Sequence, residues 1–256
     1  MLGDPRVSAC IVLYHTSLSV KDTVHDLMHS TEPVELYVVD NSPKDLTARS
    51  ILLEAPDAHV LPQKRNLGFG AANNQVLPLL HSHYHLICNP DVTFDETLLH
   101  RMVTYLDAHP DIAALTPRVF FPDGREQFLP RHRPTVRYLL GGFLEKLGRP
   151  FTTWRAEYTM QNVTLGGPME VEFATGCFLL IRTNVFYKMQ GFDPKYFLYQ
   201  EDSDLSVKIQ RYGKIVYHPD FQIRHNWNRA DKRSWRLTWY HIRSTFRFFR
   251  KWGLRW

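Results

Sequence analysis

The sequence predicts an α/β domain with a mixed, mostly parallel β-sheet flanked by helices. With 256 residues and 44% apolar content, the chain can bury a large core in one domain. Its first part contains short apolar runs rich in β-branched residues, and helical patterns lie between these runs. Such alternation is typical of βαβ units with parallel strands.

Four strands are predicted in this first part. They cover residues 7–14, 36–39, 59–61 and 85–88. The first run is apolar without alternation, as expected for a strand that is buried on both faces. Because ligands bind beyond the carboxyl ends of parallel strands, we expect the polar side chains that follow these strands to be neighbours. These side chains are Tyr14, Asp40, Asn66 and Asp91.

The pattern is less regular in the second part of the chain. Residues 117–134 are rich in Pro, Arg and Phe, and residues 141–167 resemble a loop, so we expect a mobile or substrate-shaping region here. An apolar run at 171–182, interrupted by Gly176, and a helical pattern from Asn184 indicate that regular structure then returns.

Composition narrows the class of protein. The three cysteines lie far apart without metal-ligand or redox spacing, which predicts reduced core thiols and a reducing compartment. The apolar run at 7–14 is too short to cross a bilayer and follows no basic leader, so neither secretion nor a membrane anchor is expected. The net charge of +5 favours an anionic partner, which can be a nucleotide, a nucleic acid or a membrane.

Between Arg224 and Trp256 there are ten Lys and Arg residues against one acid, Asp231, so the rest of the chain is net acidic. A basic, amphipathic helix is predicted in the tail at residues 226–256. One helical stripe is apolar and a second is basic. The apolar stripe consists of Trp235, Trp239, Ile242, Phe246 and Phe249, and the basic stripe of Arg236, Arg243, Arg247 and Arg250. This pattern fits a helix at a membrane interface, and it fits equally a helix whose aromatic face packs on the domain.

Two acidic motifs are candidates for chemistry. Asn89 and Asp91 follow the fourth strand, where Asp91 can hold a divalent cation or simply close a turn. Glu201, Asp202 and Asp204 precede a helical pattern. One acid would be enough to cap that helix, whereas three carboxylates that repel one another can raise one pKa into the range of a general base.

Two further sites are less specific. Asn66 and Gly68 lie at a tight turn that opens a helix, where the backbone can approach a ribose or phosphate closely. The spacing is not GxGxxG, which argues against a dinucleotide-binding dehydrogenase. His225 ends a predicted strand, and such a lone histidine is more often a structural residue than a ligand.

In order along the chain, four segments resemble family 2 glycosyltransferases, particularly the bacterial rhamnosyltransferase-like members that build O-antigen and other surface polysaccharides. The segments are VDNSP at 39–43, NLGFGAANN at 66–74, NPDV at 89–92 and the run ATGCF…QRYG at 174–213. The resemblance implies a GT-A fold over residues 1–225. Residues 1–95 would bind the nucleotide sugar, and residues 96–225 would form the acceptor and catalytic half.

The resemblance also implies roles for the donor-side residues. Tyr14 and Asp40 would contact the nucleotide base, and Asn66 and Gly68 would line its ribose. Asp91 would hold Mg²⁺ or Mn²⁺ at the place of the family's DxD motif. Asn89 departs from that motif because it replaces the first acid, which weakens the expected cation site. His225 would complete the metal or phosphate site.

On the catalytic side, the resemblance places the general base at Asp202, with Glu201 and Asp204 as supports or alternates. Gly176 lies where donor sugar and acceptor would meet, and a glycine needed for packing explains it equally well. The expected reaction is an inverting single displacement by an acceptor hydroxyl, with stabilisation of the departing nucleoside diphosphate by the cation.

The expected donor is dTDP-rhamnose, with a UDP-sugar as second choice, and the expected acceptor is a lipid-linked saccharide. The protein would be cytoplasmic, in peripheral contact with an anionic membrane, and would not bind nucleic acid. Two alternatives remain open at this point. A nucleic-acid-binding module would use the basic aromatic tail but leaves the acids unexplained. A nucleotidyltransferase should carry a Gly-rich phosphate loop after the first strand, where this chain reads YHTSLS.

Overall fold

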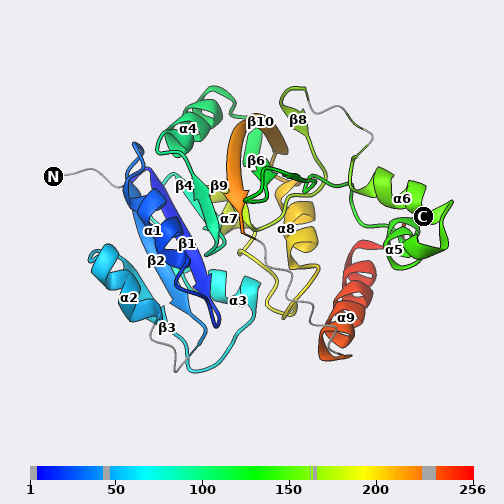
Figure 1. The fold of residues 1–256 in the computed structure, drawn as a ribbon, viewed down its shortest axis with the longest axis horizontal. Coiled ribbons are helices and arrows are strands. Elements are labelled where there is room, and N and C mark those ends of the chain that lie inside the picture. Colours follow the sequence, from blue (N-terminus) through cyan, green and yellow to red (C-terminus); the bar gives the residue numbers. More distant parts are fainter. Residues whose placement is uncertain (1–4, 43–46, 162, 164–165, 227–234) are drawn as a thin grey trace.

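A single mixed β-sheet forms the centre of the molecule (Figure 1). The computed structural model describes residues 5–42, 47–161, 163, 166–226 and 235–256. Within these residues the sheet contains ten strands, in the order β3-β2-β1-β4-β9-β6-β10-β5, with β7 paired to β6 and β8 paired to β10. The fold class that the sequence predicts is confirmed.

The first half of the chain forms the parallel part of the sheet. Strands β2 and β4 flank β1, and β3 pairs with β2, all in parallel. All four predicted strands are present, each within two residues of its expected ends. The elements of this half are β1 (Val7–Leu13), α1 (Val20–Met28), β2 (Val34–Asp40), α2 (Thr47–Glu54), β3 (His59–Pro62), α3 (Phe69–Asn73), η1 (Leu77–Leu79) and β4 (Tyr84–Cys88).

The second half continues the same sheet with mixed strand directions. Strand β9 is antiparallel to both β4 and β6, while β10 runs parallel to β6. The elements are β5 (Val92–Phe94), α4 (Leu98–Ala108), β6 (Ile112–Phe120), β7 (Glu126–Gln127), α5 (Val136–Phe143), η2 (Glu145–Leu147), α6 (Phe151–Tyr158), β8 (Met169–Glu170), β9 (Phe178–Arg182), α7 (Thr183–Lys188), α8 (Glu201–Ile209), β10 (Lys214–His225) and α9 (Trp235–Trp252).

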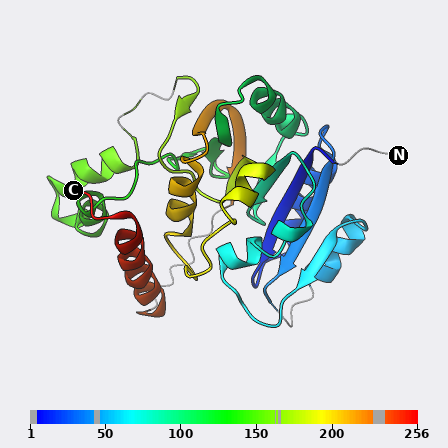
Figure 2. The same ribbon diagram turned by 180° about the vertical axis from the view of Figure 1, so that it is seen from behind.

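Helices cover both faces of the sheet, which Figures 1 and 2 show from opposite sides. Alternate residues of β1 belong to two different cores: Ala9 and Ile11 to one, Cys10 and Val12 to the other. The first core includes side chains of α1, α2 and α4, and the second includes side chains of α3, α7 and α8. This double burial explains why β1 is apolar without alternation. All three cysteines are free and buried, as expected.

The prediction of a loop over residues 141–167 is wrong for much of that range. Helix α5 extends to Phe143, and α6 follows and packs against it. Glycine and proline, which suggested a loop, have structural roles here. A Cβ at Gly141 would lie 2.9 Å from Cβ of Trp154, so the glycine lets the two helices approach, and Pro150 directly precedes α6. In the apolar run at 171–182, regular structure returns as the strand β9, which begins at Phe178.

Helix α9 packs on the domain at the end where α5 and α6 lie (Figure 1). Its buried face contains Ser244 and Phe248, and Phe248 joins a small core with Tyr196 and Val207. The predicted apolar stripe lies on a different face. Its first four residues are mostly exposed: Trp235 (78%), Trp239 (57%), Ile242 (56%) and Phe246 (69%). Phe249, the fifth residue of the stripe, packs against the small core, so α9 packs on the domain through aromatic side chains but leaves most of the predicted stripe exposed.

None of the helices in the described part of the chain is long and apolar enough to span a bilayer.

Candidate active site

The carboxyl ends of β1 and β2 place Tyr14 and Asp40 at one edge of the sheet. Leu13 and Asp40 are register partners, and the Asn41 N–H donates to the Leu13 carbonyl at 2.9 Å. Asp40 is buried, and its Oδ1 accepts the Ser42 N–H at 2.8 Å, whereas Tyr14 is half exposed. This edge therefore offers an accessible aromatic ring beside an ordered carboxylate, as base recognition requires.

A turn after β3 brings Asn66 and Gly68 to the same edge. Asn66 Oδ1 accepts the Gly68 N–H at 2.8 Å, and Asn41 Oδ1 accepts the Leu67 N–H at 3.3 Å. Gly68 has φ +83°, and a Cβ there would lie 2.2 Å from the Phe197 carbonyl oxygen. Only glycine fits this position, because any side chain would meet both the backbone strain and the clash. The turn thus packs directly against the segment that leads into α8.

Asp91, Asn89 and His225 meet where β4 ends and β10 ends. Asn89 Nδ2 lies 3.2 Å and Asp91 Oδ1 lies 3.3 Å from Nε2 of His225. Nδ1 of His225 donates to Gln127 Oε1 at 3.2 Å, and Gln127 Nε2 donates to the His225 carbonyl at 2.8 Å. Gln127 thereby selects the tautomer in which Nε2 is an electron-pair donor directed at Asn89 and Asp91.

This donor set fits a divalent cation. A carboxylate oxygen and an imidazole nitrogen 3.3 Å apart can share one ion, and Gln127 orients the histidine as outer partners of metal ligands do. Within the described residues, no group of three or more His, Cys, Asp and Glu side chains could hold a metal. Two protein ligands are nevertheless compatible with Mg²⁺, which takes its remaining oxygens from water and phosphates.

The acid cluster begins α8, and an unusual backbone places it. Tyr199 and Gln200, the two residues before the helix, both have left-handed conformations, with φ of +67° and +63°. Such non-glycine residues are uncommon and cluster at functional sites. They turn the chain so that Glu201 and Asp202 face a cavity.

Both cavity-facing acids are unsatisfied. Within the described residues, Oε2 of Glu201 and Oδ1 of Asp202 are buried and have no hydrogen-bond partner. Burial raises the pKa of Asp202 to about 6, a rise that the Gly176 backbone, Arg131 and Thr175 partly oppose. Burial, followed by the charge of Asp202, raises the pKa of Glu201 to about 8. Both pKa values are raised towards neutral pH, and a carboxylate with such a pKa is suited to act as a general base.

Asp204 lies apart from this pair. Its side chain is fully buried, and its oxygens accept from Lys251 Nζ at 2.8 Å and from Trp252 Nε1 at 2.7 Å. Both donors belong to α9. The structure therefore gives Asp204 a role in holding α9 to α8, although the sequence suggested it as an alternate base.

Gly176 keeps space open beside the base. A Cβ at this position would lie 2.9 Å from Oδ1 of Asp202 and 2.8 Å from a ring carbon of Phe69. Its neighbour Cys177 connects the two acidic sites, because the Cys177 carbonyl accepts the Asn89 N–H at 2.8 Å. Burial raises the pKa of the Cys177 thiol to about 12, and the charges of Asp202 and Asp91 add to the rise. Asp91 and Asp202 are therefore both close to Cys177.

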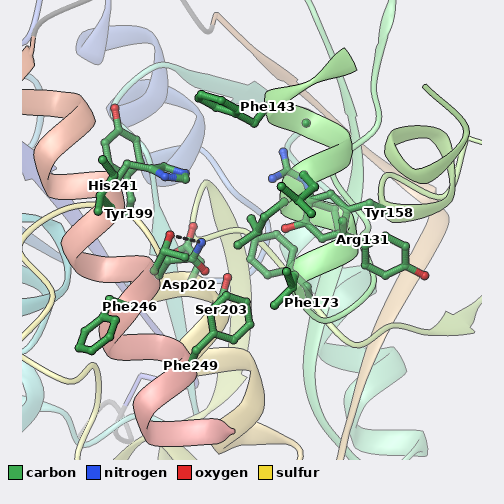
Figure 3. Close-up of a pocket in the computed structure, with 18 of the residues that line it drawn as sticks. Arg131, Phe143, Tyr158, Phe173, Tyr199, Asp202, Ser203, His241, Phe246 and Phe249 are labelled. Atoms are coloured by element: carbon green, nitrogen blue, oxygen red, sulfur yellow. Dashed lines mark hydrogen bonds between the residues drawn. The ribbon is translucent and has the colours of Figure 1, made fainter. Parts of the chain in front are cut away.

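A cavity of about 790 Å³ extends from the acids between α5, α6 and α9 (Figure 3). In this view Tyr199, His241 and Phe246 lie on one side and Arg131, Tyr158 and Phe173 on the other, with Asp202 between them. Neither Arg131 nor Gln127 is predicted as a site residue from the sequence. Both lie in the stretch 117–134, whose Arg and Pro content was the only local signal.

Comparisons with known proteins identify a family and relatives of this chain. The family described as "Glycosyl transferase family 2" matches residues 8–189. The chain is 28% identical over 210 residues to the N-acetylglucosaminyl-diphospho-decaprenol L-rhamnosyltransferase of Mycobacterium tuberculosis H37Rv, covering 76% of this chain and 67% of that protein. It is 36% identical over 81 residues to the rhamnosyltransferase WbbL of Escherichia coli K12, which is 30% of each chain.

Solved structures show the fold. The mannosyltransferase PcManGT of Pyrobaculum calidifontis, in complex with GDP-Man and Mn²⁺, matches with a TM-score of 0.64 and 16% identity over 96% of this chain. GalNAc-T7, with UDP, GalNAc and Mn²⁺, matches with a TM-score of 0.67 and 16% identity over 98% of this chain. The chain spans 65% and 49% of those two structures. These similarities confirm the predicted GT-A fold.

Proposed function

The chain belongs to glycosyl transferase family 2, and from this membership we propose that it transfers rhamnose from dTDP-rhamnose to a lipid-linked saccharide, with inversion at the anomeric carbon. Two relatives named as rhamnosyltransferases support the choice of sugar. The name of the mycobacterial relative describes a saccharide joined to a polyprenol through a diphosphate, which supports the choice of acceptor. A UDP-sugar is the second choice of donor.

One observation carries this proposal: Gly176 lies beside the general-base candidate, and the next residue, Cys177, bonds to Asn89 next to the cation-binding candidate. Oδ1 of Asp202 is unpartnered within the described chain and borders the cavity, whereas Asp91 and His225 lie at the carboxyl edge of the sheet. A hydroxyl at Asp202 would attack the anomeric carbon from the side opposite a diphosphate at Asp91. Such an in-line arrangement produces inversion.

Each residue then has a chemical task. Asp202 accepts the proton of the attacking hydroxyl, with Glu201 beside it as a support. Asp91 and His225 would hold Mg²⁺ or Mn²⁺, which would supply positive charge to the departing diphosphate. Tyr14 and Asp40 would recognise the base, with Asn66 and Gly68 at the ribose. Gly176 leaves room for the two sugars to meet.

We further propose a peripheral contact between α9 and the cytoplasmic face of an anionic membrane. The exposed apolar stripe is supported by exposed arginines at 236, 243 and 250, an arrangement suited to an interface of lipid phosphates and acyl chains. Phe143 and Trp256, both largely exposed, add apolar surface next to α9. Trp239→Ala should weaken binding to phosphatidylglycerol vesicles about tenfold, while the exposed Leu53→Ala on α2 should not.

The alternatives are not favoured. A nucleic-acid-binding module would not need two unsatisfied acids in a cavity, and a nucleotidyltransferase would not explain the family match.

Calorimetry with dTDP, UDP and GDP, each with and without Mg²⁺ or Mn²⁺, tests the proposal. We expect dTDP to bind most tightly, with metal strengthening the binding, and Asp91→Ala to abolish the metal effect. Asp57→Ala, at an exposed aspartate remote from the site, should change nothing. Transfer from dTDP-rhamnose should then produce the inverted linkage by NMR. Absence of nucleotide binding, or retention at the anomeric carbon, would contradict the proposal.

A further inference from the structure

Arg131 occupies the cavity in a fixed position. Its residue forms an antiparallel bridge with Phe173, and its guanidinium lies 5.4 Å from the centre of the Phe173 ring and 5.7 Å from that of Tyr158. Two aromatic faces therefore hold the cation in place, which limits the entropy that a ligand contact would cost.

No carboxylate in the described part of the chain forms an ion pair with Arg131, although its charge acts on Asp202 and lowers the pKa of that acid. Its Nε is buried without a hydrogen-bond acceptor. Nearby arginines share the unpartnered Nε but use their other donors within the protein: Arg137 pairs with Glu157 at 2.8 Å, and Arg133 donates to the Trp252 carbonyl at 3.0 Å. A half-buried arginine that lies on aromatic rings at a cavity wall, without such a partner among the described residues, is suited to an anionic ligand.

The rest of the cavity indicates what else that ligand carries. The free oxygens of Glu201 and Asp202 require hydroxyl groups, as a saccharide provides. Phe143, Ile242 and Phe246 form an apolar wall, and the same three side chains are exposed at the outer surface next to α9. A volume of about 790 Å³ is suitable for a ligand of one or two sugars with a phosphate group.

Resting on the proposed function, we propose that this cavity is the acceptor site and that Arg131 binds the phosphate group that joins the acceptor saccharide to its lipid. The saccharide hydroxyl then lies at Asp202, the phosphate at Arg131, and the hydrocarbon chain along the apolar wall towards α9. The donor diphosphate belongs at Asp91 and His225, beyond Gly176, so the two phosphate groups occupy different ends of the site.

Direct binding of two matched acceptors tests this assignment. One carries N-acetylglucosamine joined to a short alkyl chain through a diphosphate, and the other carries the same sugar and chain joined through an ether. We expect the diphosphate acceptor to bind at least tenfold more tightly. Arg131→Gln should remove that advantage, Arg131→Lys should keep part of it, and the exposed Arg125→Gln should keep all of it.

Three results would overturn the assignment. They are equal binding of the two acceptors, an unchanged preference in Arg131→Gln, or inorganic diphosphate that binds as tightly as the diphosphate acceptor and so marks a site for free anions. Loss of dTDP affinity in Arg131→Gln would likewise reassign the residue to the donor. Because binding is measured without turnover, Arg131-dependent acceptor binding without rhamnose transfer would support the acceptor site and contradict the proposed function. Unchanged melting temperatures would verify folding.

Discussion

The carboxyl edge of the parallel strands, where the proposed donor site lies (the donor edge), and the cavity beneath α9 differ in whether their polar atoms have hydrogen-bond partners. At the donor edge, Asp40 and Asn66 each accept a backbone N–H, and Gln127 orients His225. In the cavity, Asp202 and Arg131 have polar atoms without partners in the described chain. The first region is complete as folded, whereas the second has polar groups that a ligand would satisfy. Binding of the acceptor should therefore contribute more to ordering the site than binding of the donor.

Replacing the proposed base should give the largest effect. Asp202→Asn is expected to lower kcat by about 10² to 10⁴-fold, because the amide cannot accept the proton, while dTDP affinity by calorimetry stays unchanged. Burial raises the pKa of Asp202 above that of an unfolded chain, so its ionised form destabilises the fold. The variant should therefore melt at a higher temperature at pH 7, and this gain should disappear below about pH 4. If Asp202→Asn retained the kcat of the unchanged protein, another residue would be the base.

Gly68→Ala should show how rigid the donor edge is. The new Cβ would meet the Phe197 carbonyl in a left-handed backbone, so we expect a loss of about 3 kcal/mol in the free energy of unfolding and weaker dTDP binding. Gly124→Ala is the matched control, since Gly124 has φ +85° but no neighbouring atom within 4 Å. Gly124→Ala should report backbone strain alone. If urea denaturation gave equal losses of unfolding free energy in the two variants, the clash between a Cβ at position 68 and the Phe197 carbonyl would be refuted.

Asp204→Asn tests the connection between the cavity and α9. The variant loses its ion pair with Lys251 but keeps an acceptor for Trp252, so unfolding free energy should fall by about 2 kcal/mol. Asp193→Asn removes the other carboxylate of Lys251, which is more exposed, and should cost less. Hydrogen exchange should show α9 opening more readily in Asp204→Asn. If Asp204→Asn lowered kcat while the hydrogen exchange of α9 stayed unchanged, Asp204 would instead have a catalytic role.

The smallest effect is a shift in the pH profile. The rate at saturating donor should rise with a midpoint near pH 6, where Asp202 ionises. The positive charge of Arg131 lowers the pKa of Asp202 against the effect of burial, so Arg131→Gln should move this midpoint to higher pH. Arg125→Gln should leave it in place. If the midpoint moved to lower pH in Arg131→Gln, the charge of Arg131 would not act on the base.

Local sequence predicted the donor edge better than the cavity. Strands β1, β2 and β4 are each marked in the sequence by an apolar run. The polar residues that follow these runs are near one another because parallel strands end at the same edge of a sheet, whatever the details of packing. The contact between Gln127 and His225 joins residues 98 positions apart across a two-residue strand, which no local pattern reveals. Helices α5 and α6 were missed because Gly141 and Pro150 have packing and capping roles that composition alone does not distinguish from loops.

The same limit applies to the acids of α8. Glu201, Asp202 and Asp204 look equivalent in sequence, and only the position of α9 separates the cavity-facing pair from the buried one. The tail pattern correctly indicated an amphipathic helix, but not that Ser244 and Phe248 would form the packing face. Tertiary contacts decide both cases, and they come from parts of the chain far from the residues concerned.

The bonds from Lys251 and Trp252 to Asp204 have a mechanical consequence. Asp202 and Asp204 lie on the first turn of one short helix, so a force applied to α9 is transmitted through Asp204 to the backbone that carries the base. A helix α9 that binds lipid would then be able to displace the proposed catalytic carboxylate of Asp202. Turnover would be sensitive to the surface on which the protein lies as well as to the concentrations of its substrates.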